Sequence, residues 1–156
     1  MEGKTVSESS SVIAQIMMPQ DVNIAGNVQG GVIMRLVDTV GGLVATRHTR
    51  SNVVTASIDR LDFHYPVYVG DLVTMKASLN FTGRTSMEIG VRVEAEDRIT
   101  GEKRHVASAY LTFVALDEQG KPKPIPSLRL VTEEEKRRNR EAQARRVVRL
   151  RERQKQ

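Results

Sequence analysis

The chain has 156 residues, no cysteine and a formal net charge of +5 at neutral pH. This length fits one domain with a single hydrophobic core, and the lack of cysteine excludes disulfides, thiolate nucleophiles and thiolate metal ligands. No apolar stretch is long enough to span a bilayer, and the first residues lack the apolar segment of an export signal. We therefore expect a soluble, cytoplasmic protein that does not act on a membrane.

The excess positive charge lies at the C-terminal end. Residues 133–156 hold ten Lys or Arg and five Asp or Glu, so residues 1–132 hold equal numbers of basic and acidic side chains. This tail lacks aromatic residues that would stack on bases. We interpret it as a solvated helix or a frayed end. Binding of nucleic acid or another partner through the tail is an alternative, but the neutral remainder of the chain argues against nucleic acid.

The hydrophobic pattern predicts one strand, one buried helix and then four strands. Residues 1–11 are polar and are expected to be mobile, and residues 12–18 are typical of a strand that ends at Pro19. From Gly31 to about residue 48, apolar residues cover more than one face of a helix, which indicates burial on most sides. The Gly41-Gly42 pair would weaken an exposed helix, so it indicates close packing.

Residues 53–116 alternate between apolar and polar over four stretches that are separated by turns at 65–71, 82–84 and 99–102. This pattern predicts a four-stranded meander that wraps around the helix. Its outer face and edges would remain for subunit contacts. Thr132 followed by three glutamates predicts a C-terminal helix. We expect that helix to be weakly anchored, because few apolar residues follow.

Asp38 interrupts the apolar helix, and Gly30-Gly31 precede it. A carboxylate in such a position is costly unless it is paired or used. The glycine pair would leave free amides at a helix start, where they can polarise a carbonyl or hold an anion. An ion pair between Arg35 and Asp38, three positions apart, is the structural alternative.

Four segments resemble the hot-dog-fold acyl-CoA thioesterases of the cytosolic acyl-CoA hydrolase type. They are Pro19–Asn23 with Gly26, Gly30–Met34 with Asp38, Thr82–Met87, and Thr112–Asp117 leading to Pro124–Pro126. The resemblance runs from about residue 16 to residue 127. It implies an α+β hot-dog fold over residues 12–130, in which an antiparallel sheet wraps around the central helix. Residues 1–11 would be a flexible N-terminus, and residues 131–156 an additional basic helix or tail.

The resemblance also implies an assembly and an active site. Two chains would pair their sheets, with active sites at their interface and often a trimer of such dimers. Asp38 would act as base or nucleophile on the thioester, while Asn23 of the other subunit would position water. The amide of Gly31 would polarise the carbonyl, and Gly30 would lie against CoA. Thioester hydrolysis requires this combination of an activated oxygen and oxyanion stabilisation.

The resemblance also favours a site for the phosphates of CoA. Arg84, Thr85 and Ser86 begin a strand, where a guanidinium and hydroxyls suit phosphate oxygens. Lys121 and Lys123 are further candidates. A hairpin turn with a solvated arginine is the structural alternative for the first three. Asn23 likewise has an alternative as a turn residue, and Gly30 and Gly31 as packing residues.

The remaining polar residues indicate no other chemistry. His48, His64 and His105 have no partner at metal-ligand spacing, and the serines of residues 7–11 lack a nucleophile-elbow motif. The expected function is hydrolysis of acyl-CoA to fatty acid and CoA, with no metal and no cofactor, since CoA is part of the substrate. A non-catalytic acyl-CoA-binding or regulatory protein with a hot-dog fold is the alternative.

Overall fold

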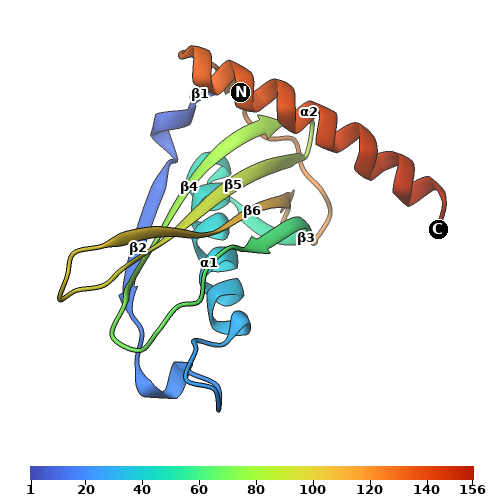
Figure 1. The fold of residues 1–156 in the computed structure, drawn as a ribbon. Helices are drawn as coiled ribbons and strands as arrows, with labels where there is room; N and C mark the ends of the chain where they lie inside the picture. Colours follow the sequence, from blue (N-terminus) through green and yellow to red (C-terminus); the bar gives the residue numbers. More distant parts are fainter.

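The computed structural model describes all 156 residues. A five-stranded antiparallel sheet carries one long helix on each of its faces (Figure 1). The sheet strands are β2 (Ser11–Ile16), β3 (Asn52–Phe63), β4 (Leu72–Thr82), β5 (Ser86–Glu96) and β6 (Lys103–Leu116), in the order β2-β4-β5-β6-β3. The helices are α1 (Gly30–Thr49) and α2 (Glu133–Gln154). Neither helix is both long and apolar enough to cross a membrane.

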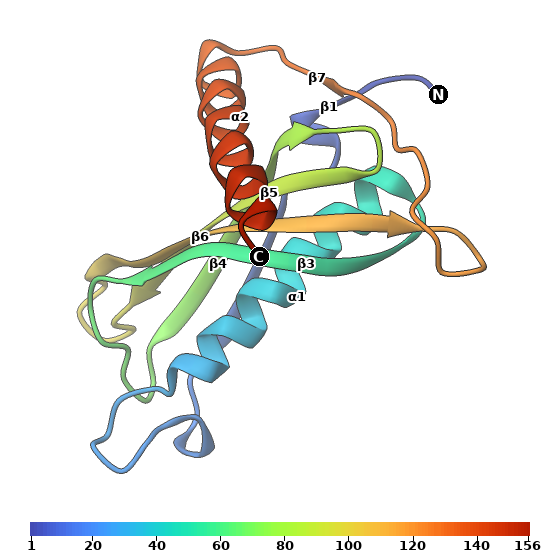
Figure 2. The same ribbon diagram turned by 90° about the vertical axis from the view of Figure 1, so that its right-hand side faces the viewer.

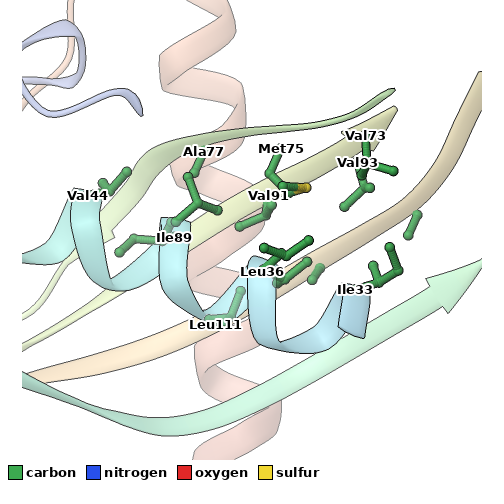
Figure 3. Packing of buried hydrophobic residues seen from close by; sticks show 14 of the residues in the cluster. Ile33, Leu36, Val44, Val73, Met75, Ala77, Ile89, Val91, Val93 and Leu111 are labelled. Carbon is green, nitrogen blue, oxygen red and sulfur yellow. The ribbon is translucent and has the colours of Figure 1, made fainter. Parts of the chain in front are cut away.

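Helix α1 lies against the inner face of the sheet and forms the core with it (Figure 3). Its residues Ile33, Leu36 and Val44 are almost fully buried against strand residues such as Met75 and Ile89. Each such side chain contributes about 1.5–3 kcal/mol through burial. The single central helix and the antiparallel sheet around it confirm the expected fold class.

The glycine pair within α1 lies where the sequence predicts close packing. A Cβ atom at Gly41 would lie 3.0 Å from Cε2 of Phe113, whereas one at Gly42 would lie 3.7 Å from the same ring. Gly41 therefore lets α1 approach β6 more closely than any larger residue would.

The expected meander is correct for β4, β5 and β6 but wrong for β3. Strand β3 pairs with β6 at one edge of the sheet, and β2 pairs with β4 at the other edge. The connection between β3 and β4, residues 64–71, crosses from one edge back to the interior of the sheet. Alternation identifies each strand but carries no information about its neighbours, which explains the error.

The N-terminal residues are packed, in contrast to the mobile segment that their composition predicts. Strand β1 (Lys4–Thr5) pairs in parallel with β7 (Leu128–Arg129), and a 3₁₀ turn follows at Val6–Glu8. The Lys4 ammonium donates to the backbone carbonyl of His48 at 2.8 Å. The Arg47 guanidinium donates to the carbonyl of Ser10 at 2.9 Å. These contacts use backbone acceptors, which composition does not reveal.

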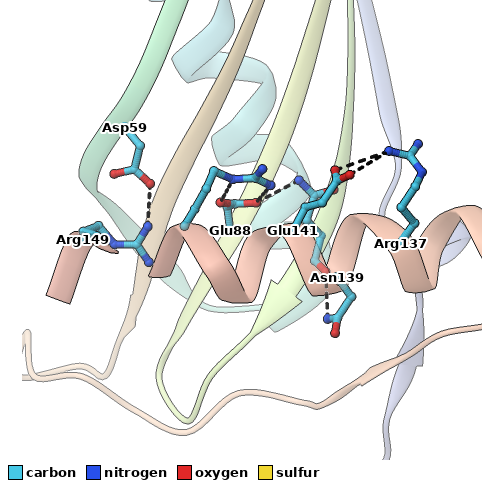
Figure 4. A network of polar contacts seen from close by, with 8 residues as sticks. Asp59, Glu88, Arg137, Asn139, Glu141 and Arg149 are labelled. Atoms are coloured by element: carbon cyan, nitrogen blue, oxygen red, sulfur yellow. Dashed lines mark hydrogen bonds and ion pairs between the residues drawn. The ribbon is translucent and has the colours of Figure 1, made fainter. Parts of the chain in front are cut away.

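Helix α2 begins as predicted, because the Thr132 hydroxyl accepts a hydrogen bond from the Glu135 amide at 3.1 Å. The expectation of weak anchoring is wrong. Ala142 is its only buried apolar residue, yet α2 is held across the outer face by polar contacts to three strands (Figure 4). These contacts are Asn139 to the Asn80 carbonyl, Arg145 to Glu88, and Arg149 to Asp59.

Candidate active site

Asp38 lies in the middle of α1, on the side that faces β3. The Thr55 hydroxyl donates to its carboxylate at 2.6 Å. Asp38 is half-buried and Thr55 is exposed. No ion pair joins Asp38 to Arg35. The structural alternative, an ion pair within the helix, is therefore wrong. Asp38 is bound instead to a residue that no sequence motif marks.

The surroundings of Asp38 form an open edge. Strand β3 is the last strand of the sheet, and only its β6 side is paired. About every second residue of this 12-residue strand therefore presents unpaired backbone groups on the other side. Large apolar side chains are exposed along it and on the adjacent helix turn, namely Met34, Val54 and Phe63. A long, apolar, unpaired edge is a template for pairing with another chain.

Gly30 and Gly31 form the first turn of α1, where their amides find no acceptor within the chain. A Cβ atom at Gly31 would meet nothing within 4 Å, so tight packing does not account for that glycine. At Gly30 the nearest atom is Cζ of Phe63, at an ordinary contact distance of 3.7 Å. The two exposed amides lie at the positive end of a 20-residue helix, which suits a carbonyl oxygen or an anion.

Asn23 lies in the loop before α1. Its backbone and side chain both close the loop on Asn27, with N–H···O distances of 2.8 Å and 3.2 Å. The adjacent Ile24 is fully exposed. This loop projects beyond the N-terminal end of α1 (Figure 2), whereas Asp38 lies eight residues inside the helix, about 12 Å along its axis. One chain therefore does not bring Asn23 to its own Asp38.

The candidate phosphate-binding residues lie at the opposite end of α1 from Gly30. Arg84 and Thr85 lie in the turn between β4 and β5, and Ser86 is the first residue of β5. The Arg84 carbonyl accepts from the Ile125 amide at 3.0 Å. This bond joins the turn to the segment that carries Lys121 and Lys123. The exposed side chains of Arg84 and Lys121 form no ion pair. The 20 residues of α1 separate this end from Gly30 by about 30 Å.

Lys123 lines an open hollow of about 560 Å³ beside the C-terminal end of α1. Arg50 and Asn52 line the same hollow, as do Asp117 and Glu118, so two cations and two carboxylates face it. Arg50 caps α1 in a left-handed conformation, with φ at 52°. Neither it nor Asn52 was singled out from the sequence, because nothing local marks them as neighbours of Lys123.

The three histidines do not form one cluster, because only His64 and His105 lie together. His64 and His105 stack edge to face, with ring centroids 5.2 Å apart. His48 is buried elsewhere, and its Nε2 lies 2.8 Å from the Pro126 carbonyl. Burial lowers the pKa of His48 below its usual value. No group of three or more His, Asp or Glu side chains is arranged to hold a metal ion.

Comparison with known proteins gives the family. Residues 25–102 match the thioesterase superfamily. The chain belongs to this superfamily. Among relatives, the cytosolic acyl coenzyme A thioester hydrolase of Mus musculus is 42% identical over 146 residues, which cover 92% of this chain and 38% of that protein. The chain thus spans less than half the length of this relative.

Solved structures resemble this thioesterase-superfamily chain along nearly its whole length. A hexameric acyl-CoA thioesterase has a TM-score of 0.94 and 39% identity, and the match covers 97% of both chains. An acyl-CoA hydrolase from Staphylococcus aureus has a TM-score of 0.90 and 34% identity, and the match covers 97% of this chain and 93% of the hydrolase chain. That structure was solved with butyryl coenzyme A and coenzyme A. These matches include α2 as well as the hot-dog core.

Proposed function

We propose that this chain hydrolyses acyl-CoA thioesters to free fatty acid and CoA, with Asp38 as base or nucleophile. The observation that carries the proposal is the Asp38 carboxylate held by Thr55 at an open sheet edge. The names of its relatives support the substrate class. The reaction uses no cofactor, since CoA is part of the substrate, and the name of the mouse relative supports the cytoplasm as its location.

The assembly that we propose is a pair of chains joined through β3. Antiparallel pairing of the two β3 edges about a two-fold axis would continue one sheet across both chains. It would also set the two α1 helices antiparallel, with the start of each beside the middle of the other. The Asn23 loop and the Gly31 amide of one chain would then lie near Asp38 of its partner. The hexameric relatives support three such pairs as the complete assembly.

The chemistry follows from the groups that this pairing would bring together. Asp38 would take a proton from water, or attack directly, while the partner's Gly31 amide stabilises the oxyanion that forms on the thioester carbonyl. The partner's Asn23 would hold the water. With Asp38 as base, the oxygen of the deprotonated water adds to the carbonyl carbon, the C–S bond breaks, and the thiolate of CoA takes up the proton that Asp38 accepted. With Asp38 as nucleophile, the C–S bond breaks to leave an anhydride between Asp38 and the acyl group; water then hydrolyses the anhydride to the fatty acid and free Asp38, and supplies the proton for the thiolate. Arg84, Thr85, Ser86, Lys121 and Lys123 would bind the phosphates of CoA.

Variants of the Staphylococcus aureus enzyme give independent support. Its structure was solved with one asparagine, one aspartate or one threonine replaced by alanine. These three positions follow one another at intervals of 15 and 17 residues. Asn23, Asp38 and Thr55 have the same types, order and intervals in this chain. The match supports Thr55 as a third member of the site.

The test is release of CoA thiol from acyl-CoAs between acetyl and palmitoyl, with the Asp38→Asn variant beside the wild type. We expect the variant to lose at least about 100-fold in kcat, as for removal of a general base or nucleophile. Glu102→Gln, which neutralises an exposed turn carboxylate, is the matched control and keeps wild-type activity. Full activity in Asp38→Asn would refute the assignment. Saturable CoA binding without thiol release by the wild type would favour the binding-only alternative.

A further inference from the structure

Helix α2 crosses the outer face of the sheet one strand after another (Figure 4). Its contacts advance along the helix in the same order as the strands advance across the sheet. They are Asn139 to Asn80 on β4, Arg145 to Glu88 on β5 and to the ring of Tyr110 on β6, and Arg149 to Asp59 on β3. The helix therefore runs almost perpendicular to the strands.

The dimensions agree with such a crossing. Asn139 and Arg149 are ten residues apart, about 15 Å along a helix. From β4 to β3 there are three strand spacings, about 14 Å. At Arg149 the helix has therefore reached the edge strand, and it continues for five residues to Gln154, about 7 Å more. Its last turns extend past β3 (Figure 1).

The overhanging end carries apolar residues that have nothing to cover them. Val147, Val148 and Leu150 are 49%, 53% and 39% exposed. The rest of α2 has alanine as its only apolar residue type. Single exposed hydrophobic residues are ordinary. Val147 and Leu150, however, are three positions apart and so lie side by side on one side of this charged helix, whereas Val148 faces another side. The same end is basic, with Arg151, Arg153 and Lys155.

We propose that this end of α2 packs on a second copy of the chain, over its β3 and beside its α2, and so braces the seam between the paired sheets. The proposal rests on the β3 pairing of the proposed function. A partner strand would begin about 5 Å beyond β3, within reach of the overhang. The outer face of that strand carries Asp59, Arg60 and Asp62, and both acids are already paired within their own chain, with Arg149 and Arg60. Burial of the exposed apolar residues of α2, rather than charge, would therefore drive this contact.

The position of the two-fold axis supports contact between the two helices. Pairing along all of β3 puts the axis between Ser57 and Ile58. Asp59, where α2 crosses, lies one to two residues from that point, about 5 Å along the strand. Two α2 helices related by the axis would lie about 10 Å apart, which is the usual packing distance of helices. Measured along α2, the two-fold axis lies half a strand spacing beyond Arg149. Leu150 is the helix residue at that distance.

The test uses the absence of cysteine from the chain. Three single variants, Leu150→Cys, Ser57→Cys and Gln143→Cys, are treated with a short bismaleimide and analysed under denaturing conditions. Leu150→Cys and Ser57→Cys are expected to give covalent dimers in high yield. Gln143 is the matched control, since it lies seven residues earlier on the same side of α2, about 10 Å farther from the axis. It is expected to remain monomeric.

The double variant Ser57→Cys with Leu150→Cys identifies the partner. If both positions touch the same second copy, the product remains a covalent dimer. Chains larger than a dimer would show that α2 contacts another copy, and would overturn the proposal. Cross-linking at Ser57 without cross-linking at Leu150 would overturn it while leaving the sheet pairing intact. Failure at both positions would refute the pairing itself, and with it this inference.

Discussion

The Thr55 hydroxyl donates a 2.6 Å hydrogen bond to Oδ1 of Asp38. The other carboxylate oxygen, Oδ2, has no partner in the chain. The bond joins the central helix to the edge strand, across 17 positions of sequence. A carboxylate oriented through one oxygen and free at the other is suited to act as base or nucleophile, because orientation lowers the entropic part of the barrier.

Replacing Thr55 by valine, which has nearly the same shape, is expected to lower kcat for acyl-CoA hydrolysis about tenfold, equivalent to about 1.4 kcal/mol. KM should change little, since the role we propose for the hydroxyl is to orient Asp38. Steady-state kinetics with the best acyl-CoA of the series would measure both constants. Thr55→Ser keeps the hydroxyl and should retain most of the activity. Equal losses in both variants would mean that the methyl group matters and the hydrogen bond does not.

The buried ion pair beneath α2 allows a stability prediction. Glu88 is 1% exposed, and Arg145 donates to both of its oxygens at 2.8 Å. The hydrogen bond from the guanidinium to Glu88 raises the pKa of Arg145. Arg145→Met leaves a buried carboxylate without its cation, so the free energy of unfolding should fall by about 3 kcal/mol. Urea unfolding followed by circular dichroism would measure it.

The double variant Glu88→Gln with Arg145→Met separates two effects of removing the arginine. One is the cost of a buried Glu88 carboxylate without a cation, and the other is the lost packing of the aliphatic part of the arginine side chain. A glutamine can keep the hydrogen bond from Asn80, which donates to Glu88 at 3.0 Å. The double variant should therefore recover part of the lost stability. If it is less stable than Arg145→Met alone, the buried charge is not the source of the loss.

Periodicity predicted most of the fold, because burial on one face leaves a regular trace in the sequence. Alternation identified β4, β5 and β6, and the apolar run after Gly31 identified α1. The place of β3 at the sheet edge was missed, since pairing between distant strands has no local signature. The anchoring of α2 was also missed, because Asn139, Arg145 and Arg149 look like solvated residues in isolation.

The candidate site was predictable where a residue breaks a pattern. Asp38 stands out as a charge in an apolar helix, and Gly30-Gly31 as glycines at a helix start. Thr55 breaks no pattern, because threonine is common in strands. It becomes visible only when the fold brings β3 beside α1. Asn23 and Asp38 come from regions that a single chain keeps apart, so the proposal that they act together across two subunits rests on the family resemblance and not on residue spacing.

The glycine pair of α1 provides a matched test of packing. At Gly42 an added methyl group meets Phe113 at an ordinary 3.7 Å, so Gly42→Ala should be neutral or stabilise the protein by up to about 1 kcal/mol through helix propensity. At Gly41 the distance is 3.0 Å, and overpacking should cost about 1–3 kcal/mol. Thermal unfolding of the two variants gives the comparison. Equal midpoints would show that α1 shifts freely against β6.

His48 is expected to make stability depend on pH. Burial lowers the pKa of His48 in the folded chain, and the nearby charge of Lys4 lowers it further. The hydrogen bond to the Pro126 carbonyl raises the pKa but does not cancel the effect of burial. Below about pH 6.5 the unfolded chain therefore binds a proton that the folded chain does not. The free energy of unfolding should decrease as the pH falls from about 7 to 5. In His48→Gln the side-chain amide can still donate to the Pro126 carbonyl but does not titrate. The free energy of unfolding of this variant should therefore change less with pH over that interval. Urea unfolding at each pH compares the two proteins, and identical slopes would mean that other groups set the pH dependence.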